Sequence, residues 1–319
     1  MKNRNLIIII LITLSIVLAG CGNSGQGPGK VQPVFFGGKE GIVALFEDIG
    51  SVSVGGAPEV WEDQSFPISI LLLNKGEFEV LPHTVKLKIK GINPNDFTLS
   101  GGEASADFTG ENNQVIDKVS EYFPTGGEEQ IFFGNADYKG VVGYFFDANV
   151  LIEYDYLYET KIAVPKVCFK GDIRDKRFCQ IDGQKPGFAS GGPISVGSVV
   201  ERSAGKGRIM VEIPISNAGK GRAKIDDLGA DFNPIYDEVS IVEITQGWEC
   251  EARGNTNVIR IPAAPAKQTT MLRCKFGFGN PIGEDDVFES QLDVRLQYRY
   301  QDAVAQTIRI RENPELPNN

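Results

Sequence analysis

Apolar and polar positions alternate in two stretches of the chain, "FPISILLLNKG" and "IMVEIPISNAG". Their apolar side chains fall on every second position, and these are Phe66, Ile68, Ile70 and Leu72 in the first and Ile209, Val211, Ile213 and Ile215 in the second. A period of two predicts a β-strand with one face in a core. Each stretch ends in an Asn-Xaa-Gly turn, because Asn and Gly tolerate positive φ. We therefore expect two equivalent strands, each followed by the same turn.

Pro67 and Pro214 lie within these two predicted strands. Proline has no backbone N–H to donate to a neighbouring strand, so within sheets it is found at edges and bulges. We therefore expect each strand to lie at the edge of its sheet or to carry a bulge.

A second pair of strands repeats at the same distance. "VLIEYDY" places Tyr154 on the apolar face of one strand, and "LDVRLQYRY" places Tyr298 on the apolar face of the other. Tyr154 follows Asn74 by 80 residues, and Tyr298 follows Asn217 by 81 residues. Two landmarks at nearly equal spacing indicate a tandem duplication with a period near 143 residues. In each copy we expect the Tyr-Xaa-Tyr strand to enter a closing hairpin.

No stretch carries a sustained helical stripe, and 37 glycines and 17 prolines favour many short strands joined by turns. The alternating strand that runs into an Asn-Xaa-Gly turn, as in "ISILLLNKG" and "VEIPISNAG", resembles immunoglobulin-like modules, especially the cell-adhesion-related kind of archaeal and bacterial surface proteins. The resemblance implies an all-β fold of two tandem immunoglobulin-like antiparallel β-sandwiches. It also implies a role in adhesion, scaffolding or presentation, with no particular ligand. The stretch around residues 96–135 exceeds a minimal module of this type.

These patterns divide the chain into six segments. We expect a signal peptide or membrane anchor at 1–20, a flexible tether at 21–37, the first sandwich at 38–165, a disulfide hairpin and hinge at 166–192, the second sandwich at 193–312 and a disordered tail at 313–319. The tether segment "GNSGQGPGK" is rich in glycine and cannot bury a core.

The N-terminal segment has the pattern of an export signal. Lys2 and Arg4 precede an apolar run from Leu6 to Leu18, which is shorter than the ~20 residues of a spanning helix. "LAGC", ending at Cys21, resembles the lipobox of lipoproteins, whose cysteine becomes the lipidated first residue. An uncleaved N-terminal anchor is the alternative. Both interpretations place the rest of the chain outside the cytoplasm, attached to a membrane by its N-terminal end.

Assigning Cys21 to a lipid leaves four of the five cysteines. An even number in an exported chain favours disulfides over free thiols. Four cysteines allow three pairings, and we favour the local pairs, Cys168–Cys179 and Cys250–Cys274. A zinc site is disfavoured because no Cys-Xaa-Xaa-Cys pair occurs and the single histidine, His83, is remote in sequence.

The formal net charge of the chain is −10. An anionic body repels the phosphate backbone, so we expect no nucleic-acid partner. The expected partners are the membrane, through the N-terminal segment, and a protein or glycan of the cell envelope.

Candidate chemistry is sparse. A serine or cysteine hydrolase would have to use His83, which we interpret as an ordinary strand-edge histidine. A glycosidase with two carboxylates is left open, because the separation of carboxylates in space is invisible in a sequence. We expect no enzyme activity and no cofactor.

Two acidic loops are calcium candidates, because calcium is bound by several oxygen atoms. Their carboxylates are Asp226, Asp227 and Asp231 in the first loop and Glu284, Asp285 and Asp286 in the second. Neither loop has EF-hand spacing, so solvated turns are the favoured interpretation. Trp61 and Trp248 are candidate platforms for sugar rings, although single tryptophans near strand ends usually pack in a core.

The sequence therefore predicts a non-enzymatic, membrane-tethered surface protein that acts in adhesion, scaffolding or envelope architecture. A solute- or glycan-binding lipoprotein is the second hypothesis, and it requires a concave pocket with converging polar groups. A secreted hydrolase is the third.

Overall fold

The computed structural model describes residues 34–52, 57–93, 95–102, 108–227, 231–263 and 268–315, and these ranges contain β-strands and no helix. The all-β prediction is therefore confirmed for the described residues. The expected leader, the lipid-attachment candidate Cys21, most of the tether and residues 316–319 lie outside them. Residues 33–319 form one compact unit of the chain, and its buried apolar side chains form a single core cluster.

Two sets of strands occur in the same order along the chain. The first set is β1 (Ile42–Phe46), β4 (Phe66–Asn74), β5 (Val85–Lys90), β6 (Phe97–Ser100), β7 (Thr109–Glu111), β8 (Glu128–Tyr138) and β9 (Phe145–Lys170). The second set is β12 (Ile194–Val196), β13 (Val199–Ser203), β14 (Ile209–Asn217), β16 (Tyr236–Ile244), β17 (Trp248–Glu251), β18 (Val258–Pro262), β19 (Thr270–Phe276) and β20 (Val287–Arg311). We call these sets the first and second units.

Five short strands accompany the two units. They are β2 (Ser51–Val52), β3 (Pro58–Trp61), β10 (Gly183–Lys185), β11 (Phe188–Ala189) and β15 (Arg222–Lys224).

The sheets repeat the same arrangement in both units. One sheet of the first unit has the order β1-β4-β8-β6, and the corresponding sheet of the second unit has the order β13-β14-β19-β17. A third sheet, with the main path β18-β16-β20-β9-β5-β7, contains strands of both units and reads equivalently from either end. This repeated order agrees with the duplication inferred from the sequence.

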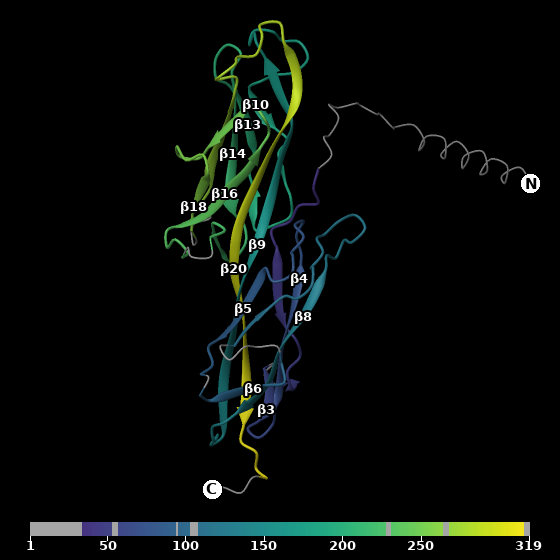
Figure 1. The fold of residues 1–319 in the computed structure, drawn as a ribbon, viewed down its shortest axis with the longest axis vertical. Coiled ribbons are helices and arrows are strands. Elements are labelled where there is room, and N and C mark those ends of the chain that lie inside the picture. The colour runs from purple at the N-terminus through teal and green to yellow at the C-terminus, as the bar shows by residue number, and fades with distance from the viewer. Residues whose placement is uncertain are drawn as a thin grey trace, which may run out of the picture. The chain divides into compact units, whose positions relative to one another are not determined.

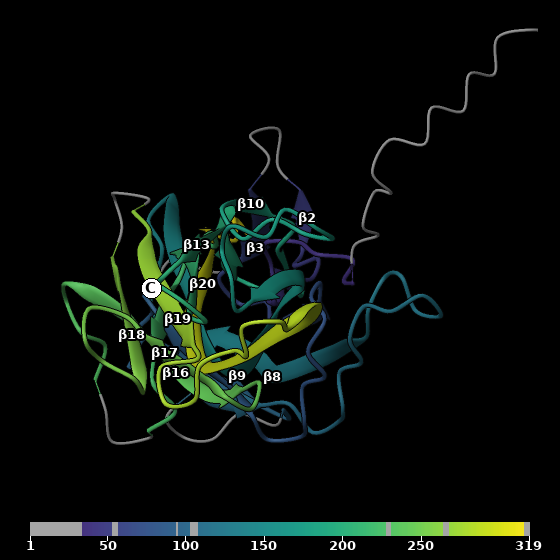
Figure 2. The same cartoon turned by 90° about the horizontal axis from the view of Figure 1, so that it is seen from above.

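The long strands β9 and β20 join the two units. They pair antiparallel from Phe145–Arg311 at one end to Lys170–Val287 at the other, and they lie side by side in Figure 1. Figure 2 shows β16 and β18 grouped together, away from β8. The closing hairpin expected in each unit is therefore wrong, because each Tyr-Xaa-Tyr strand pairs with its counterpart in the other unit.

The contacts of the Asn-Xaa-Gly turns define which residues are equivalent. The side-chain amide of Asn74 donates to the Phe78 carbonyl, and that of Asn217 donates to the Gly221 carbonyl, four residues on in both cases. Asn74 Oδ1 and Asn217 Oδ1 each accept the N–H of the glycine two residues on. The two turns have the same geometry, as their sequences predict.

A tyrosine hydroxyl packs against each turn. A Cβ atom on Gly76 would overlap the Tyr158 hydroxyl, and a Cβ on Gly219 would overlap the Tyr300 hydroxyl. Tyr158 and Tyr300 are therefore the equivalent tyrosines, rather than Tyr154 and Tyr298 as the spacing suggested. The sequence alignment slipped because tyrosines recur at every second position of both strands.

The two prolines lie in central strands, so the edge prediction is wrong. β4 pairs with β1 and β8, and its register with β8 shifts between Ile68 and Ser69, next to Pro67. In the second unit, Pro214 lies opposite the break between β12 and β13, where its carbonyl accepts the Gly197 N–H. A local irregularity accommodates each missing donor.

The segment between the units differs from the expected hinge. The expected boundary at residue 165 lies inside β9, which continues to Lys170. Beyond it, β10 pairs with β13 and β11 pairs with β9, so the segment runs back along the second unit. A free hinge is excluded for these residues because they are hydrogen-bonded to two different strands.

Two disulfides are present, and both lie at the second unit. They join Cys168 to Cys179 across 11 residues and Cys250 to Cys274 across 24 residues. These are the two local pairings that the sequence favoured. Cys250 and Cys274 are paired residues of the neighbouring strands β17 and β19.

Candidate functional site

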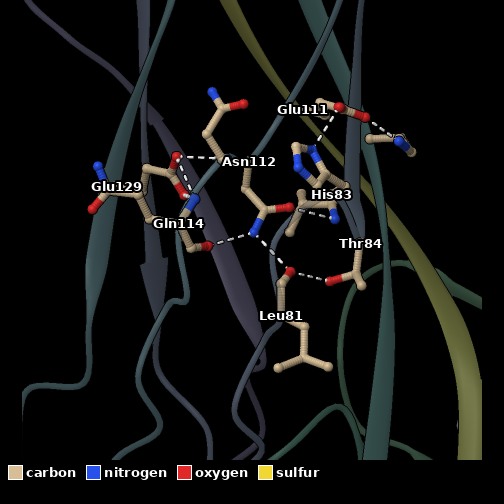
Figure 3. Close-up of polar contacts among 10 residues, drawn as sticks. Leu81, His83, Thr84, Glu111, Asn112, Gln114 and Glu129 are labelled. Carbon is tan, nitrogen blue, oxygen red and sulfur yellow. Dashed lines mark hydrogen bonds and ion pairs between the residues drawn. The ribbon is translucent and has the colours of Figure 1, made fainter.

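A polar groove lies on the first unit, where the edge strand β7 meets β5 and β8. Its cavity volume is about 1170 Å³. Charged side chains that line it are Lys86, Lys88, Glu111, Glu129, Glu153 and Asp155. Figure 3 shows the group of polar residues at one end of this groove. The strands place these side chains because lysines and acids alternate with buried Leu87 and its neighbours on β5.

Asn112 organises this end of the groove. Its side chain is fully buried, and its amide donates to the carbonyls of Leu81 and Gln114. Its Oδ1 atom accepts the N–H of Val85, the first residue of β5 (Figure 3). A buried amide with all these groups satisfied fixes the positions of the loops that it joins.

Glu129 fixes the loop that follows Asn112. Its carboxylate is 9% exposed and accepts the backbone N–H groups of Asn113, at 2.7 Å, and Gln114, at 3.2 Å. Figure 3 shows these bonds from β8 to the loop. Backbone donors stabilise a buried carboxylate. The groove floor is thus held by a built network of side chains.

His83 lies beside Glu111 at the rim of the groove. Its φ of 63° places it in a turn before β5, rather than in the strand expected from the sequence. Nδ1 of His83 lies 2.7 Å from Glu111 Oε1, and Lys86 contacts the other carboxylate oxygen. Hydrogen bonds from Lys86 and then from His83 lower the pKa of Glu111, so this carboxylate is ionised near neutral pH.

The other acids of the groove also have cationic partners. Glu153 contacts Lys90 at 2.7 Å, and Asp155 contacts Arg299 of the second unit at 2.7 Å. Arg299 is only 7% exposed and also donates to the Thr84 carbonyl. The groove therefore presents paired charges, amides and hydroxyls, which can hydrogen-bond a polyhydroxylated or zwitterionic ligand.

The calcium candidates do not converge among the residues that the structure describes. Asp226 contacts Arg299 at 3.6 Å, and Glu284 contacts Lys206 at 2.9 Å. The backbone of Asp286 instead closes a turn with Gly283 and accepts the Gly171 N–H. The acidic loops are thus involved in ion pairs and turns.

The two tryptophans have different environments. Trp248 is 7% exposed and packs against Phe169 and Phe276, so it belongs to the core. Trp61 is 45% exposed at the end of β3. The platform interpretation is therefore wrong for Trp248.

Five tyrosines fill the core between the units, namely Tyr154, Tyr156, Tyr158, Tyr298 and Tyr300. Tyr156 and Tyr300 are paired residues of β9 and β20, and their rings lie 5.8 Å apart. Burial is the main cause that raises the pKa of each hydroxyl well above its ordinary value. These phenols stay neutral and act in packing.

The sequence analysis missed the groove. Glu111, Asn112 and Glu129 lie in the stretch of residues 96–135 whose extra length had no explanation. That insertion in a repeated unit is the signal that could have located them, because additions to a framework often carry function. Among the described residues, no helix is long and apolar enough to cross a membrane.

Comparisons with known proteins give no family. No family model matches the chain, and no curated protein matches it. A chain from the complete structure of manganese lipoxygenase of Gaeumannomyces graminis and partial structure of zonadhesin of Komagataella pastoris is 13% identical. It aligns over 84% of this chain and 93% of its own length at a TM-score of 0.13. So slight a likeness carries no argument about fold or function.

Proposed function

We propose that this chain is a non-enzymatic surface protein, exported and tethered by its N-terminal end, that holds a stiff two-unit body outside the cytoplasm for adhesion or scaffolding. The observation that carries the proposal is the pairing of β9 with β20 along their whole length. A two-stranded ribbon that belongs to both units resists bending between them, which suits a load-bearing or presenting role. We interpret each unit as an immunoglobulin-like sandwich in which this ribbon completes the core.

Two further features support export. The two disulfides are typical of an oxidising compartment. The "LAGC" sequence ending at Cys21 resembles a lipidation signal. A lipid at this cysteine followed by the glycine-rich stretch would leave the body free to reach partners on the cell envelope.

Fractionation of cells that express the full chain tests the tether. We expect the chain in the membrane fraction, labelled by an alkyne fatty acid, and released to the soluble extracytoplasmic fraction by Cys21→Ser. A Cys21→Ser variant that stays in the membrane would favour an uncleaved anchor. Recovery of the full chain in the cytosol with free thiols would overturn the proposal.

The groove favours a second candidate function, which is glycan binding. Its paired carboxylates, lysines and amides match the hydrogen-bonding demands of sugar hydroxyls. A glycan array probed with the full chain in detergent micelles tests this function. Retention of a defined glycan that is lost with Glu111→Gln, and kept with the remote exposed substitution Glu251→Gln, would support it.

A further inference from the structure

The second unit has a seam between two strand edges, and the chain itself fills it. β10 pairs with β13 through Lys185 and Val199, and β11 pairs with β9 through Phe188 and Ala163. In the same seam, Ser190 satisfies Lys161 of β9, because its N–H donates to the Lys161 carbonyl and its hydroxyl accepts the Lys161 N–H. Residues 183–190 thus act as an inserted strand.

The equivalent seam of the first unit lies along β20. Because Tyr158 and Tyr300 are equivalent, Lys161 and Ala163 of β9 correspond to Ala303 and Ala305 of β20. On this side, β20 pairs with β15 at residues 299–301 and with β3 at residues 309–311. Among the described residues, no strand pairs with this edge between those two segments. The position that β11 occupies in the second unit is open in the first.

The open edge presents backbone hydrogen-bonding groups. The Asp293 carbonyl accepts the Thr245 N–H and the Arg311 carbonyl accepts the Glu62 N–H, both on the side away from β9. Strand groups alternate in direction, so Ala303, Ala305 and Thr307 direct their N–H and C=O groups to the same side. An unpaired edge of this kind is a template for another strand.

The Ala303 N–H has only a local substitute for a strand partner. It donates to the side chain of the preceding residue, Asp302, at 2.8 Å. The equivalent Lys161 in the second unit instead has both backbone groups bonded to the inserted segment. Asp302 therefore occupies the role that Ser190 has in the filled seam.

A cavity of about 310 Å³ lies beside this edge. Its walls come from β1 and from β20 at Asp302, Ala303 and Val304, and Tyr156 and Tyr300 also line it. On the β1 side, the Tyr154 hydroxyl donates to the Ile42 carbonyl at 3.5 Å. The β1 edge is thus partly satisfied, which leaves β20 as the edge that can accept a strand.

We propose that this seam binds an extended segment of a partner protein, which pairs with β20 at residues 303–307 as β11 pairs with β9. The filled seam indicates the sequence that fits. Its segment is "GQKPGFASGG", residues 183–192, and a Cβ on Gly187 or Gly192 would crowd Val199 or Tyr158. The partner segment is therefore extended and rich in Gly, Ala and Ser, with a hydroxyl or amine that can donate to Asp302. This inference goes beyond the proposed function, because a strand can bind whether or not the chain is tethered.

The test uses a synthetic peptide with the sequence GQKPGFASGG and the full chain in detergent micelles. Binding is followed by fluorescence anisotropy of the labelled peptide, and the site by hydrogen exchange. We expect saturable binding and slower amide exchange in the segment 302–308. We also expect a version of the peptide with Ser replaced by Ala to bind more weakly.

Two substitutions at one position separate pairing from folding. Ala305→Pro removes an N–H that faces the seam and leaves the N–H groups that face β9, so peptide affinity should fall at least tenfold. Ala305→Val keeps that N–H and places an exposed side chain outside the seam, so affinity should be unchanged. The unfolding midpoint of each variant, measured by circular dichroism, reports whether the chain is folded.

Three results would overturn the proposal. One is absence of saturable peptide binding by the folded chain at up to millimolar peptide. Another is binding that Ala305→Pro leaves unchanged while Ala305→Val is folded. The third is strong exchange protection of residues 302–308 before any peptide is added, which would assign the seam to a segment of this same chain.

Discussion

The two units share one framework and differ in how it is finished. Both have the same strand order, the same Asn-Xaa-Gly turn and an equivalent tyrosine packed on that turn. Both disulfides lie at the second unit, and its seam is filled by β10 and β11. The first unit has the polar groove and the open edge of β20. Duplication supplies two copies of a scaffold, so one copy can be stabilised while the other keeps surfaces for binding.

The largest expected effect comes from removing the disulfides. Replacing both cysteine pairs by serine should lower the free energy of unfolding by roughly 3 kcal/mol for each loop. Because both bridges lie at the second unit, hydrogen exchange should accelerate there before it accelerates in the first unit. Chemical denaturation with exchange measured by mass spectrometry checks this. Equal acceleration in both units would show that the shared β9–β20 ribbon makes them unfold together.

The packed glycines come next. Gly76→Ala places a Cβ against the Tyr158 hydroxyl and within 2.7 Å of two backbone carbonyl oxygens, those of Glu40 and Gly191. Overpacking of this kind costs about 3 kcal/mol. Gly219→Ala meets the Tyr300 hydroxyl, with the Pro193 side chain at 3.0 Å, so it should be milder, at about 2 kcal/mol.

Gly143→Ala is the control for this pair, because a Cβ there meets nothing within 4 Å. Thermal unfolding of the three variants should rank them in the order Gly76, Gly219, Gly143. A Gly76→Ala variant as stable as Gly143→Ala would refute the equivalence of Tyr158 and Tyr300.

A buried acid gives the second unit a pH dependence of its own. Glu201 is fully buried on β13, and burial raises its pKa to about 7 although Lys185, at 2.8 Å, and the Cys168 N–H lower it. The folded state then holds a proton that the unfolded state releases near the ordinary value of 4.5. Stability contributed by this proton is present below pH 4.5 and is lost as the pH rises through 7, by roughly 3 kcal/mol in total.

Glu201→Gln should remove this slope. The measurement is the difference in unfolding free energy between the wild-type chain and the variant from pH 4 to pH 8, which cancels the titration of all other groups. A constant difference across that range would contradict the assignment. Glu251→Gln, at an exposed ion pair on the same unit, serves as the matched control.

The smallest effect concerns the outer face of the ribbon. Asp147 and Arg309 form a two-pronged ion pair at 2.7 and 2.9 Å, and the next rung is a neutral hydrogen bond of 2.7 Å between Thr307 and Asn149. Asp147→Asn should cost about 0.5 kcal/mol at low salt and less at high salt, because ions screen exposed charges. Thr307→Val should cost a similar amount at every salt concentration. Unfolding titrations at two ionic strengths distinguish the two rungs.

Local patterns predicted the strands of this protein well. The alternation in residues 66–74 and 209–217 gave β4 and β14, and the Asn-Xaa-Gly turns after them have the predicted geometry. These features depend on neighbours within a few residues, and a sequence states those directly. The local cysteine pairs also match the two disulfides, because Cys250 and Cys274 lie opposite each other in adjacent strands.

The groove and the seam were beyond such patterns. Glu111 and Glu129 approach the Asn112 loop from different strands, and Asp155 finds its partner, Arg299, 144 residues away. No local rule connects residues at that separation. The same holds for the prolines, whose central positions depend on which strands arrive on either side.

The sequence alone determined that this chain is built from strands, that the strands come in two copies, and where the first turn of each copy lies. These follow from periodicity and from the conformations that Asn and Gly allow. Only the tertiary structure decided that the copies share one core, because β9 could have closed its own unit and instead pairs with β20. Strand pairing over long distances depends on the free energy of the whole assembled sheet, and that quantity is not written in any one stretch of residues.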